Sequence, residues 1–258
     1  MPPRLLLFDL DGTLLRSDKT VSPGNLAALK RCRQQGALIG VCTSRGEPGV
    51  RRLLARLGLC PDVLITSAGA LARVGEEIVY EAGFSVQETR TLLAAARALD
   101  GGKYHITADT VDNIYHSYAS TTDPTRAGGI HTDFSDFDLP SLKICVEVGT
   151  EEKAQALARS VPHCLAVRFV GEDWYKFTKD TATKSRAIWA VAARLGLALE
   201  ELTAFGDDLP DLDMLRACGT GVAMANALPE VKAAADTVIG DNDSDAIAAY
   251  LDQIYSGA

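Results

Sequence analysis

One stretch near the N-terminus, LLLFDLDGT at residues 5–13, joins a short apolar run to two carboxylates and a glycine. A continuous apolar run of this length is typical of a strand buried on both faces of a parallel sheet. Successive side chains of a strand alternate between its faces, so Asp9 and Asp11 would point the same way if the strand continued. Gly12 lets the chain turn away sharply. The stretch therefore predicts two carboxylates that reach one pocket.

Two carboxylates this close resist joint ionisation unless a cation lies between them or one of them stays protonated. The pair therefore predicts either a bound Mg²⁺ or a carboxylate nucleophile beside a general acid/base. The alternative interpretation is a strand that ends in an ordinary Asp-Gly turn, because Asp-Gly is a common turn signal. We favour phosphoryl chemistry.

Composition limits the partners and the compartment. A formal net charge of -8 over 258 residues argues against a nucleic-acid partner, because no basic surplus exists to neutralise phosphates. An acidic protein that binds a phosphorylated small molecule must supply positive charge locally, through a metal, a lysine or backbone N–H groups.

The six cysteines are scattered, which favours free thiols in a reducing cytoplasm. The apolar run at residues 5–8 is far too short for a signal peptide or a membrane span, so we expect a cytoplasmic protein without a membrane partner, either monomer or homodimer.

The two ends of the chain alternate strands with helices. Such alternation indicates an α/β fold with a doubly wound, Rossmann-like parallel sheet, whose ligands gather beyond the carboxyl ends of the strands. Ser22 and Pro23 predict the start of the first helix as its N-cap and first residue. Strands are expected at residues 5–8, 37–42, 63–66, 202–205, 221–224 and 237–239, and helices at residues 23–36, 47–57, 184–195, 212–216, from 229 and at 245–254.

The pattern changes in the middle of the chain. A hairpin is expected at residues 71–74 and 77–80, followed by paired strands with single helices, which suggest an inserted α+β domain. Its helices are predicted at residues 86–99 and 151–160, its strands at 103–107, 113–118, 142–148, 165–170 and 174–178, and an irregular stretch at 119–139. We therefore expect a discontinuous core at residues 1–82 and 183–258 and a cap domain at residues 83–182.

Four separated elements carry a family resemblance. They are Asp9-Leu10-Asp11-Gly12-Thr13, Thr43-Ser44-Arg45, Lys184, and Gly206-Asp207-Asp208-Leu209-Pro210-Asp211. Their order, with a long insertion between the second and third, resembles the haloacid-dehalogenase-like superfamily, and most closely its Cof-type sugar-phosphatase branch with a large α/β (C2-type) cap. Further similarities lie at Gly69-Ala70, residues 221–227 and residues 235–238.

The resemblance implies a phosphatase and a role for each matching residue. Asp9 would attack phosphorus to give an aspartyl phosphate, while Asp11 would protonate the leaving alcohol and then activate water. Thr43 would donate its hydroxyl to a phosphate oxygen, and Lys184 would neutralise Asp9 and the phosphoryl group. Phosphate or substrate contacts are implied at Gly12, Ser44, Arg45, Asn226 and Lys176.

The resemblance also implies a Mg²⁺ site. Asp9, the backbone carbonyl of Asp11 and Asp207 would bind the ion, with Asp211 or Asp208 holding its waters, and a hard cation prefers such oxygen ligands. Taken singly, each of these residues also fits a purely structural role. Thr43 could be a helix N-cap, Lys184 a solvated lysine at a helix start, and the acidic cluster could cap a helix N-terminus.

The chain departs from the family pattern at four positions. Pro210 and Ala68 stand where the family frequently has Asn, and Ser44 and Ala225 stand where it frequently has Gly. Without an Asn at position 210, a hydrogen bond that orients the acidic loop is lost or replaced, and Asp208 is a candidate to compensate. The departures bear on rate and substrate preference more than on the type of reaction. Pro210 and Ala68 are the features that favour the alternative hypothesis of a catalytically weak phosphate-binding or regulatory protein.

The expected substrate is a small phosphorylated metabolite, with sugar or polyol phosphates as the leading class. A phosphatase of glycosyl-glycerate or phosphoglycolate type is the narrower alternative, and a mutase or a dehalogenase is disfavoured. Cap residues should set the specificity because the cap of such an enzyme closes over its site. The candidates are Glu172, Asp173, Trp174, Tyr175, Lys176, His105 and His116. For Trp174 and Tyr175 packing is the favoured interpretation, and for the two histidines it is a structural or surface role.

Overall fold

The structure is a computed structural model that describes residues 2–99, 105–118, 129–169 and 171–255. The chain divides into two compact units. The first unit comprises Met1–Ser44, Leu54–Tyr80 and Thr183–Ala258, and the second comprises Arg45–Leu53 and Glu81–Ala182. The domain limits expected from the sequence remain a prediction, and in this division Arg45–Leu53 groups with the inserted segment.

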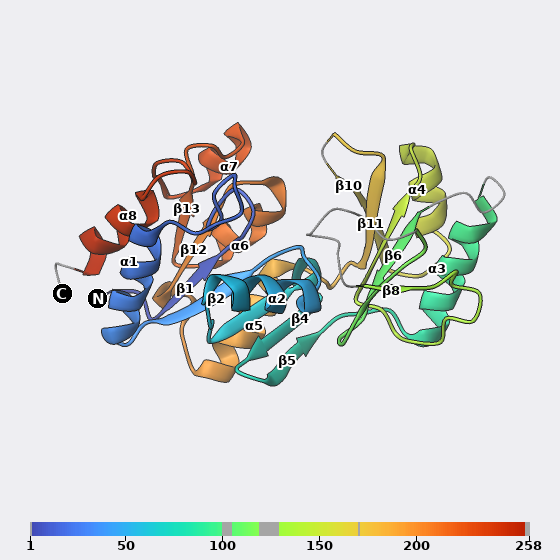
Figure 1. The fold of residues 1–258 in the computed structure, drawn as a ribbon, viewed down its shortest axis with the longest axis horizontal. Helices are drawn as coiled ribbons and strands as arrows, with labels where there is room; N and C mark the ends of the chain where they lie inside the picture. The colour runs from blue at the N-terminus through green and yellow to red at the C-terminus, as the bar shows by residue number, and fades with distance from the viewer. Residues whose placement is uncertain (1, 100–104, 119–128, 170, 256–258) are drawn as a thin grey trace. The chain divides into compact units, whose positions relative to one another are not determined.

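The first unit is built on an eight-stranded sheet among the described residues (Figure 1). Its first six strands in spatial order pair in parallel, and the next strand runs antiparallel to its neighbour. The spatial order is β14 (Thr237–Val238), β13 (Thr220–Ala223), β12 (Leu202–Gly206), β1 (Leu5–Phe8), β2 (Leu38–Cys42), β3 (Val63–Thr66), β4 (Leu71–Val74) and β5 (Glu77–Glu81). The predicted Rossmann-like parallel core is confirmed.

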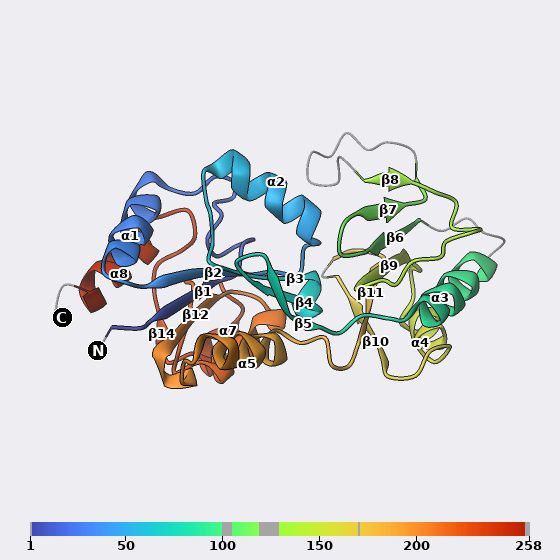
Figure 2. The same ribbon diagram turned by 90° about the horizontal axis from the view of Figure 1, so that it is seen from below.

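Helices cover both faces of this sheet (Figure 2). On one face, α5 (Lys184–Leu195), α6 (Leu212–Ala217) and α7 (Pro229–Ala234) pack on Leu5 and Leu7 of the central strand. On the other face, α1 (Pro23–Gln34) packs against α8 (Ala246–Tyr255). As the sequence predicts, α1 begins behind an N-cap at Ser22, whose side chain accepts a hydrogen bond from a backbone N–H of the first turn.

The register of the central strands determines where the polar residues emerge. All four residues of β1 are buried, and Phe8 lies beside Phe205 of β12 and Val41 of β2. Because the three strands are parallel, their carboxyl ends meet at one edge of the sheet. Asp9 follows β1 directly at this edge, and Thr43 follows β2.

The second unit contains a six-stranded sheet among its described residues (Figure 2). Its pairs are antiparallel except for the last, which is parallel. The order is β10 (Cys164–Arg168), β11 (Trp174–Lys179), β9 (Lys143–Glu147), β6 (Ile106–Asp109), β7 (Ile114–His116) and β8 (Ile130–His131). One face of the sheet packs against α3 (Val86–Ala98) and α4 (Glu151–Ala158) around Ile144, Val146 and Phe177.

Two details of the second unit differ from the sequence prediction. The strand expected at residues 103–107 runs as Ile106–Asp109, and residues 100–104 lie outside the described residues. The stretch expected to be irregular contains β8, whose two exposed residues carry no alternating pattern, while residues 119–128 lie outside the described residues. α2 spans Glu47–Leu57 as predicted. Within the described parts of the chain, no helix combines the length and apolarity that crossing a bilayer requires.

Candidate active site

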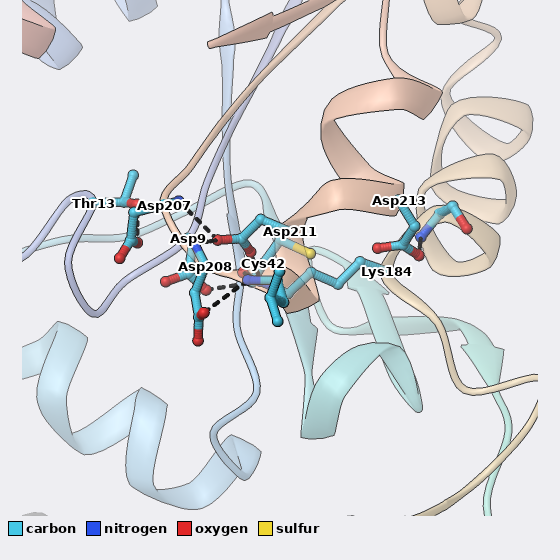
Figure 3. A network of polar contacts seen from close by, with 10 residues as sticks. Asp9, Thr13, Cys42, Lys184, Asp207, Asp208, Asp211 and Asp213 are labelled. Atoms are coloured by element: carbon cyan, nitrogen blue, oxygen red, sulfur yellow. Dashed lines mark hydrogen bonds and ion pairs between the residues drawn. The ribbon is translucent and has the colours of Figure 1, made fainter. Parts of the chain in front are cut away.

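A buried lysine lies at the centre of the polar cluster in the first unit (Figure 3). Lys184 is the first residue of α5, and the preceding Thr183 caps this helix by accepting the backbone N–H of Arg186 at 3.2 Å. The Lys184 side chain is 2% exposed, and its Nζ donates to Asp9 Oδ1 at 2.7 Å and to Asp211 Oδ1 at 2.5 Å. A third hydrogen bond goes to the carbonyl of Cys42 at 2.8 Å. One ammonium group thus joins the ends of β1 and β2 to the loop after β12.

Three carboxylates share this cluster. Asp9, Asp207 and Asp211 each offer an oxygen, and these oxygens lie within 4.8 Å of one another. Thr13, which is fully buried, donates from Oγ1 to Asp207 Oδ1 at 2.6 Å. The three acids come from two segments about 200 residues apart in the chain, brought together by the parallel pairing of β1 with β12.

The loop that carries two of these acids is organised by Asp211. Its Oδ2 accepts the backbone N–H groups of Asp207 at 2.9 Å and of Asp208 at 3.1 Å. The side chain of Asp208 instead accepts the N–H of Leu209 at 2.8 Å, as the N-cap of a short 3-10 helix. These bonds support the loop although Pro210 stands at the position where the family frequently has Asn.

Burial and like charges shift the pKa values of the cluster. Burial raises the pKa of Asp9 to about 8, although the nearby Lys184 ammonium opposes this shift. Burial also raises the pKa of Asp207 to about 6, against the hydrogen bond from Thr13. For Lys184, burial disfavours the charged form, but the carboxylates of Asp211 and Asp9 outweigh burial and raise its pKa well above the usual value. One lysine thus faces three acids, so the cluster has an excess of potential negative charge.

This donor set fits a hard divalent cation. Its oxygens are carboxylate oxygens at close spacing, which is the chemistry that Mg²⁺ prefers. The raised pKa values of Asp9 and Asp207 are the consequence of burying acids without sufficient countercharge, and a cation among them would remove that cost.

Gly12 and Asn226 shape the chain beside the acids. Gly12 has φ +81°, and a Cβ at this position would lie 2.2 Å from Asp207 Oδ2. The Asn226 side chain donates to the Gly12 carbonyl at 2.8 Å. The resemblance implies phosphate or substrate contacts for both residues, and in the structure they hold the turn after β1 against the acidic loop.

The other residues expected at the site lie in different surroundings. Asp11 forms an ion pair with Lys19 at 2.8 Å in which both side chains are partly exposed. Thr43 is buried directly after β2, and Ser44 follows it, half-buried. Arg45 and Lys176 belong to the second unit. The carboxylate of Asp208 lies outside the group formed by the three close acids.

Sequence reasoning did not assign roles to several residues that organise the cluster. Thr13 belongs to the opening motif, so its position was a usable signal for its bond to Asp207. Lys19 and the Cys42 carbonyl carry no such signal, because their partners depend on the fold. Ala68 adopts φ 62° and ψ 30°, a left-handed conformation that Asn tolerates better than Ala. This geometry gives a physical reason for the Asn that the family frequently places here.

Known proteins resemble the chain over almost its whole length. The family described as haloacid dehalogenase-like hydrolases matches residues 6–251. The HMP-PP phosphatase of Serratia proteamaculans is 29% identical, with 96% of this chain and 94% of the relative covered. The pyridoxal phosphate phosphatase YbhA of Escherichia coli is 26% identical, and the match covers 97% of this chain and 98% of the relative.

A solved structure agrees in fold with the whole chain. The sugar phosphatase BT4131, of haloacid dehalogenase subclass IIB, superposes with a TM-score of 0.80 at 26% identity. The superposition covers 98% of this chain and 99% of the BT4131 chain. The family match, the phosphatase relatives and this shared fold agree with the resemblance seen in the motifs. The chain belongs to the haloacid dehalogenase-like hydrolases, as an enzyme of their Cof-type phosphatase branch.

Proposed function

We propose that this chain is a Mg²⁺-dependent phosphomonoesterase of the cytoplasm that acts on small phosphorylated metabolites, with sugar or polyol phosphates as the leading class. The observation that carries the proposal is the buried contact of Lys184 with Asp9 and Asp211. Packing alone accounts poorly for a buried carboxylate held by a lysine beside two further acids, because burying such charges is costly. The arrangement suits a nucleophile that must accept a highly charged phosphoryl group.

Asp9, Asp207 and the backbone carbonyl of Asp11 would hold Mg²⁺, with Asp211 supporting its waters. When bound, the ion supplies charge neutralisation for the phosphate and lowers the pKa of Asp9, which burial otherwise raises to about 8. Ionised Asp9 is the form that can act as a nucleophile. The proposed metal requirement therefore has a direct physical reason in this chain.

Asp9 and Asp11 would carry out the hydrolysis in two steps. A carboxylate oxygen of Asp9 forms a bond to phosphorus while the bond from phosphorus to the ester oxygen breaks, and Asp11 gives its proton to the departing alcohol. Asp11 then takes a proton from water, whose oxygen attacks phosphorus and releases Asp9 and inorganic phosphate. Lys184 and the hydroxyl of Thr43 would stabilise the charge on the phosphoryl oxygens throughout.

We also propose that residues 83–182 form the cap that selects the substrate. The relatives support a small phosphorylated molecule without choosing one, since their names refer to HMP-PP, pyridoxal phosphate and a sugar phosphate. Because these names refer to different molecules that each carry phosphate, specificity must come from residues outside the shared chemistry. The second unit supplies the candidates.

The test is hydrolysis of p-nitrophenyl phosphate by the pure protein, with Mg²⁺ and with EDTA, beside the Asp9→Asn variant. We expect turnover that requires the metal and falls at least about a thousandfold in Asp9→Asn, because no other nucleophile replaces it. Asp252→Asn is the matched control, since Asp252 lies on α8 in an exposed ion pair with Arg31, and it should keep most of the activity. Absence of Asp9-dependent turnover would favour the phosphate-binding alternative.

A further inference from the structure

The six-stranded sheet of the second unit ends in a strand that has a neighbour on one side only. Within the described part of the chain, β10 pairs antiparallel with β11 and with no other strand (Figure 1). Such an edge offers a row of backbone N–H and C=O groups to any strand that can lie beside it. Proteins therefore protect their sheet edges by shortness, by charged side chains or by proline.

The other three sheet edges among the described residues carry this protection, and β10 does not. β8 and β14 are only two residues long, a length that leaves little backbone for a further strand. β5 has a charged residue at each end, Glu77 and Glu81. β10 is five residues long, and its sequence, CLAVR, contains no proline and a single charge at its last residue. A further strand can therefore add most readily at β10.

The hydrogen bonds to β11 determine which backbone groups face the open side. Just beyond β10, Phe169 donates its backbone N–H to the carbonyl of Trp174 at 3.0 Å. In an antiparallel ladder such bonded pairs recur at every second residue, so the odd-numbered residues of β10 direct their backbone groups toward β11. The even-numbered residues direct theirs toward the open edge. These residues are Cys164, Ala166 and Arg168.

Two apolar side chains of β10 are exposed to water on one face of the sheet. Leu165 is 48% exposed and Val167 is 42% exposed. Because they lie two positions apart, both side chains point to the same face. Their partners on β11 are Thr178 and Lys176, which alternate with the core residue Phe177, so this face is the one opposite the apolar core. The edge thus presents apolar side chains together with its backbone groups.

We propose that β10 pairs with β10 of a second copy of this chain, antiparallel and about a two-fold axis at Ala166. In this arrangement the two Ala166 residues exchange a pair of backbone hydrogen bonds, and Cys164 of each copy does the same with Arg168 of the other. Leu165 lies opposite Val167 in the intervening pairs, where the side chains of an antiparallel ladder come closest. The two six-stranded sheets join into one continuous sheet.

The sequence of β10 is complementary to itself in this register. Apolar residues lie opposite apolar residues, and Arg168, the one charged residue of the strand, lies opposite the uncharged side chain of Cys164. No like charges of the two strands face each other, although the chain as a whole has a net charge of -8. A two-fold interface requires only one such self-complementary surface. These features identify a second copy as the partner of the edge.

The test is the mass of the whole chain in solution, measured by analytical ultracentrifugation over a range of concentrations. We expect twice the mass of one chain at high concentration and dissociation on dilution, which gives the dissociation constant of the dimer. A protein that stays monomeric up to about 100 µM overturns the proposal, because specific interfaces of standard size reach micromolar affinity or better.

Ala166→Pro tests the backbone pairing. It removes an N–H that points to the open edge, and it leaves the hydrogen bonds between β10 and β11 in place. Each dimer loses two hydrogen bonds, so the dissociation constant should rise by about tenfold or more. Ala166→Ser keeps the N–H and is the matched control, which should leave the dissociation constant unchanged. Circular dichroism shows whether each variant folds, and the side-chain variants decide if Ala166→Pro does not.

Val167→Lys tests the apolar contacts. It places a charge opposite Leu165 twice in each dimer and should raise the dissociation constant by about tenfold or more. Val238→Lys is the matched control, because Val238 is 49% exposed on the edge strand β14, and it should change nothing. Adding Leu165→Glu to Val167→Lys places opposite charges face to face between the copies, so the double variant should recover most of the lost affinity.

Two further outcomes overturn the proposal. A dimer whose dissociation constant is the same in the wild type, in Ala166→Pro and in Val167→Lys uses another surface of the protein. A dimer that both single substitutions weaken, but that the double variant does not restore, contradicts the register about Ala166. None of these measurements involves hydrolysis of a phosphate ester, so their outcome is independent of the proposed function.

Discussion

Replacement of Lys184 by methionine should be among the most damaging single substitutions in the first unit. Methionine nearly matches the shape of the lysine stem but removes the ammonium group that contacts Asp9, Asp211 and the carbonyl of Cys42. The side chains of Asp9 and Asp211 are only 12% and 2% exposed, so water cannot replace the lost partner. Breaking a buried ion pair from one side costs about 3–5 kcal/mol. This cost is a large part of a typical free energy of unfolding of about 5–15 kcal/mol.

The size of the loss should depend on pH and on metal. Burial already raises the pKa of Asp9 to about 8, and loss of Lys184 raises it further, so Asp9 stays protonated at low pH and the missing countercharge matters less. We expect a larger loss at pH 8 than at pH 6, approaching about 3–5 kcal/mol as the pH rises and Asp9 ionises. Mg²⁺ should restore part of the stability, because the cation binds the acids that the variant leaves without a partner.

The assay is urea unfolding of the EDTA-treated protein at both pH values, followed by the same measurement with Mg²⁺. Lys30→Met, an exposed substitution on α1, controls for the loss of one surface charge and should change the free energy of unfolding by less than about 0.5 kcal/mol. The reasoning is refuted if Lys184→Met costs less than about 1 kcal/mol at pH 8, since a surface pair would cost as little. It is equally refuted if the cost is the same in an Asp211→Asn background, because coupled residues must show an interaction energy.

Three further predictions concern the same cluster. The pKa values of Asp9 and Asp207 are raised from 3.8 to about 8 and about 6. Between pH 3.8 and those values, the metal-free folded state therefore binds protons that the unfolded chain has lost. Its Tm should therefore fall as pH rises from 5 to 8, whereas a flat or rising Tm in EDTA would contradict the shifts. Thr13→Ala should weaken Mg²⁺ binding by about tenfold or more, measured by calorimetry, while Thr13→Ser should retain the affinity through its hydroxyl. Gly12→Ala should lower the free energy of unfolding in urea more than Gly36→Ala does. Both glycines have a positive φ, but only at position 12 would the new Cβ clash with a neighbouring side chain, that of Asp207. Equal losses in the two variants would exclude the clash.

Local patterns predicted the elements whose signals lie within a few residues. The apolar run of β1, the Ser22-Pro23 start of α1 and the hairpin of β4 and β5 agree with the structure, because strand burial, helix capping and turn residues act over short distances. β6 and β8 were misplaced or missed in the second unit. The pairing of β6 with β9, distant in the chain, determines which residues extend there, and β8 is too short for its pattern to be read.

The sequence by itself determined the candidate chemistry, since Asp9, Thr43 and Asp207 follow the ends of predicted parallel strands and, with Lys184, stand in an order that resembles one family. Only the tertiary structure decided which side chains these residues contact. Lys184 meets Asp9 across 175 positions of the chain and Thr13 meets Asp207 across 194, and no local pattern specifies such pairs. Strand register and helix packing bring them together and exclude water, so that burial raises the pKa of Asp9 while the carboxylates of Asp211 and Asp9 raise that of Lys184.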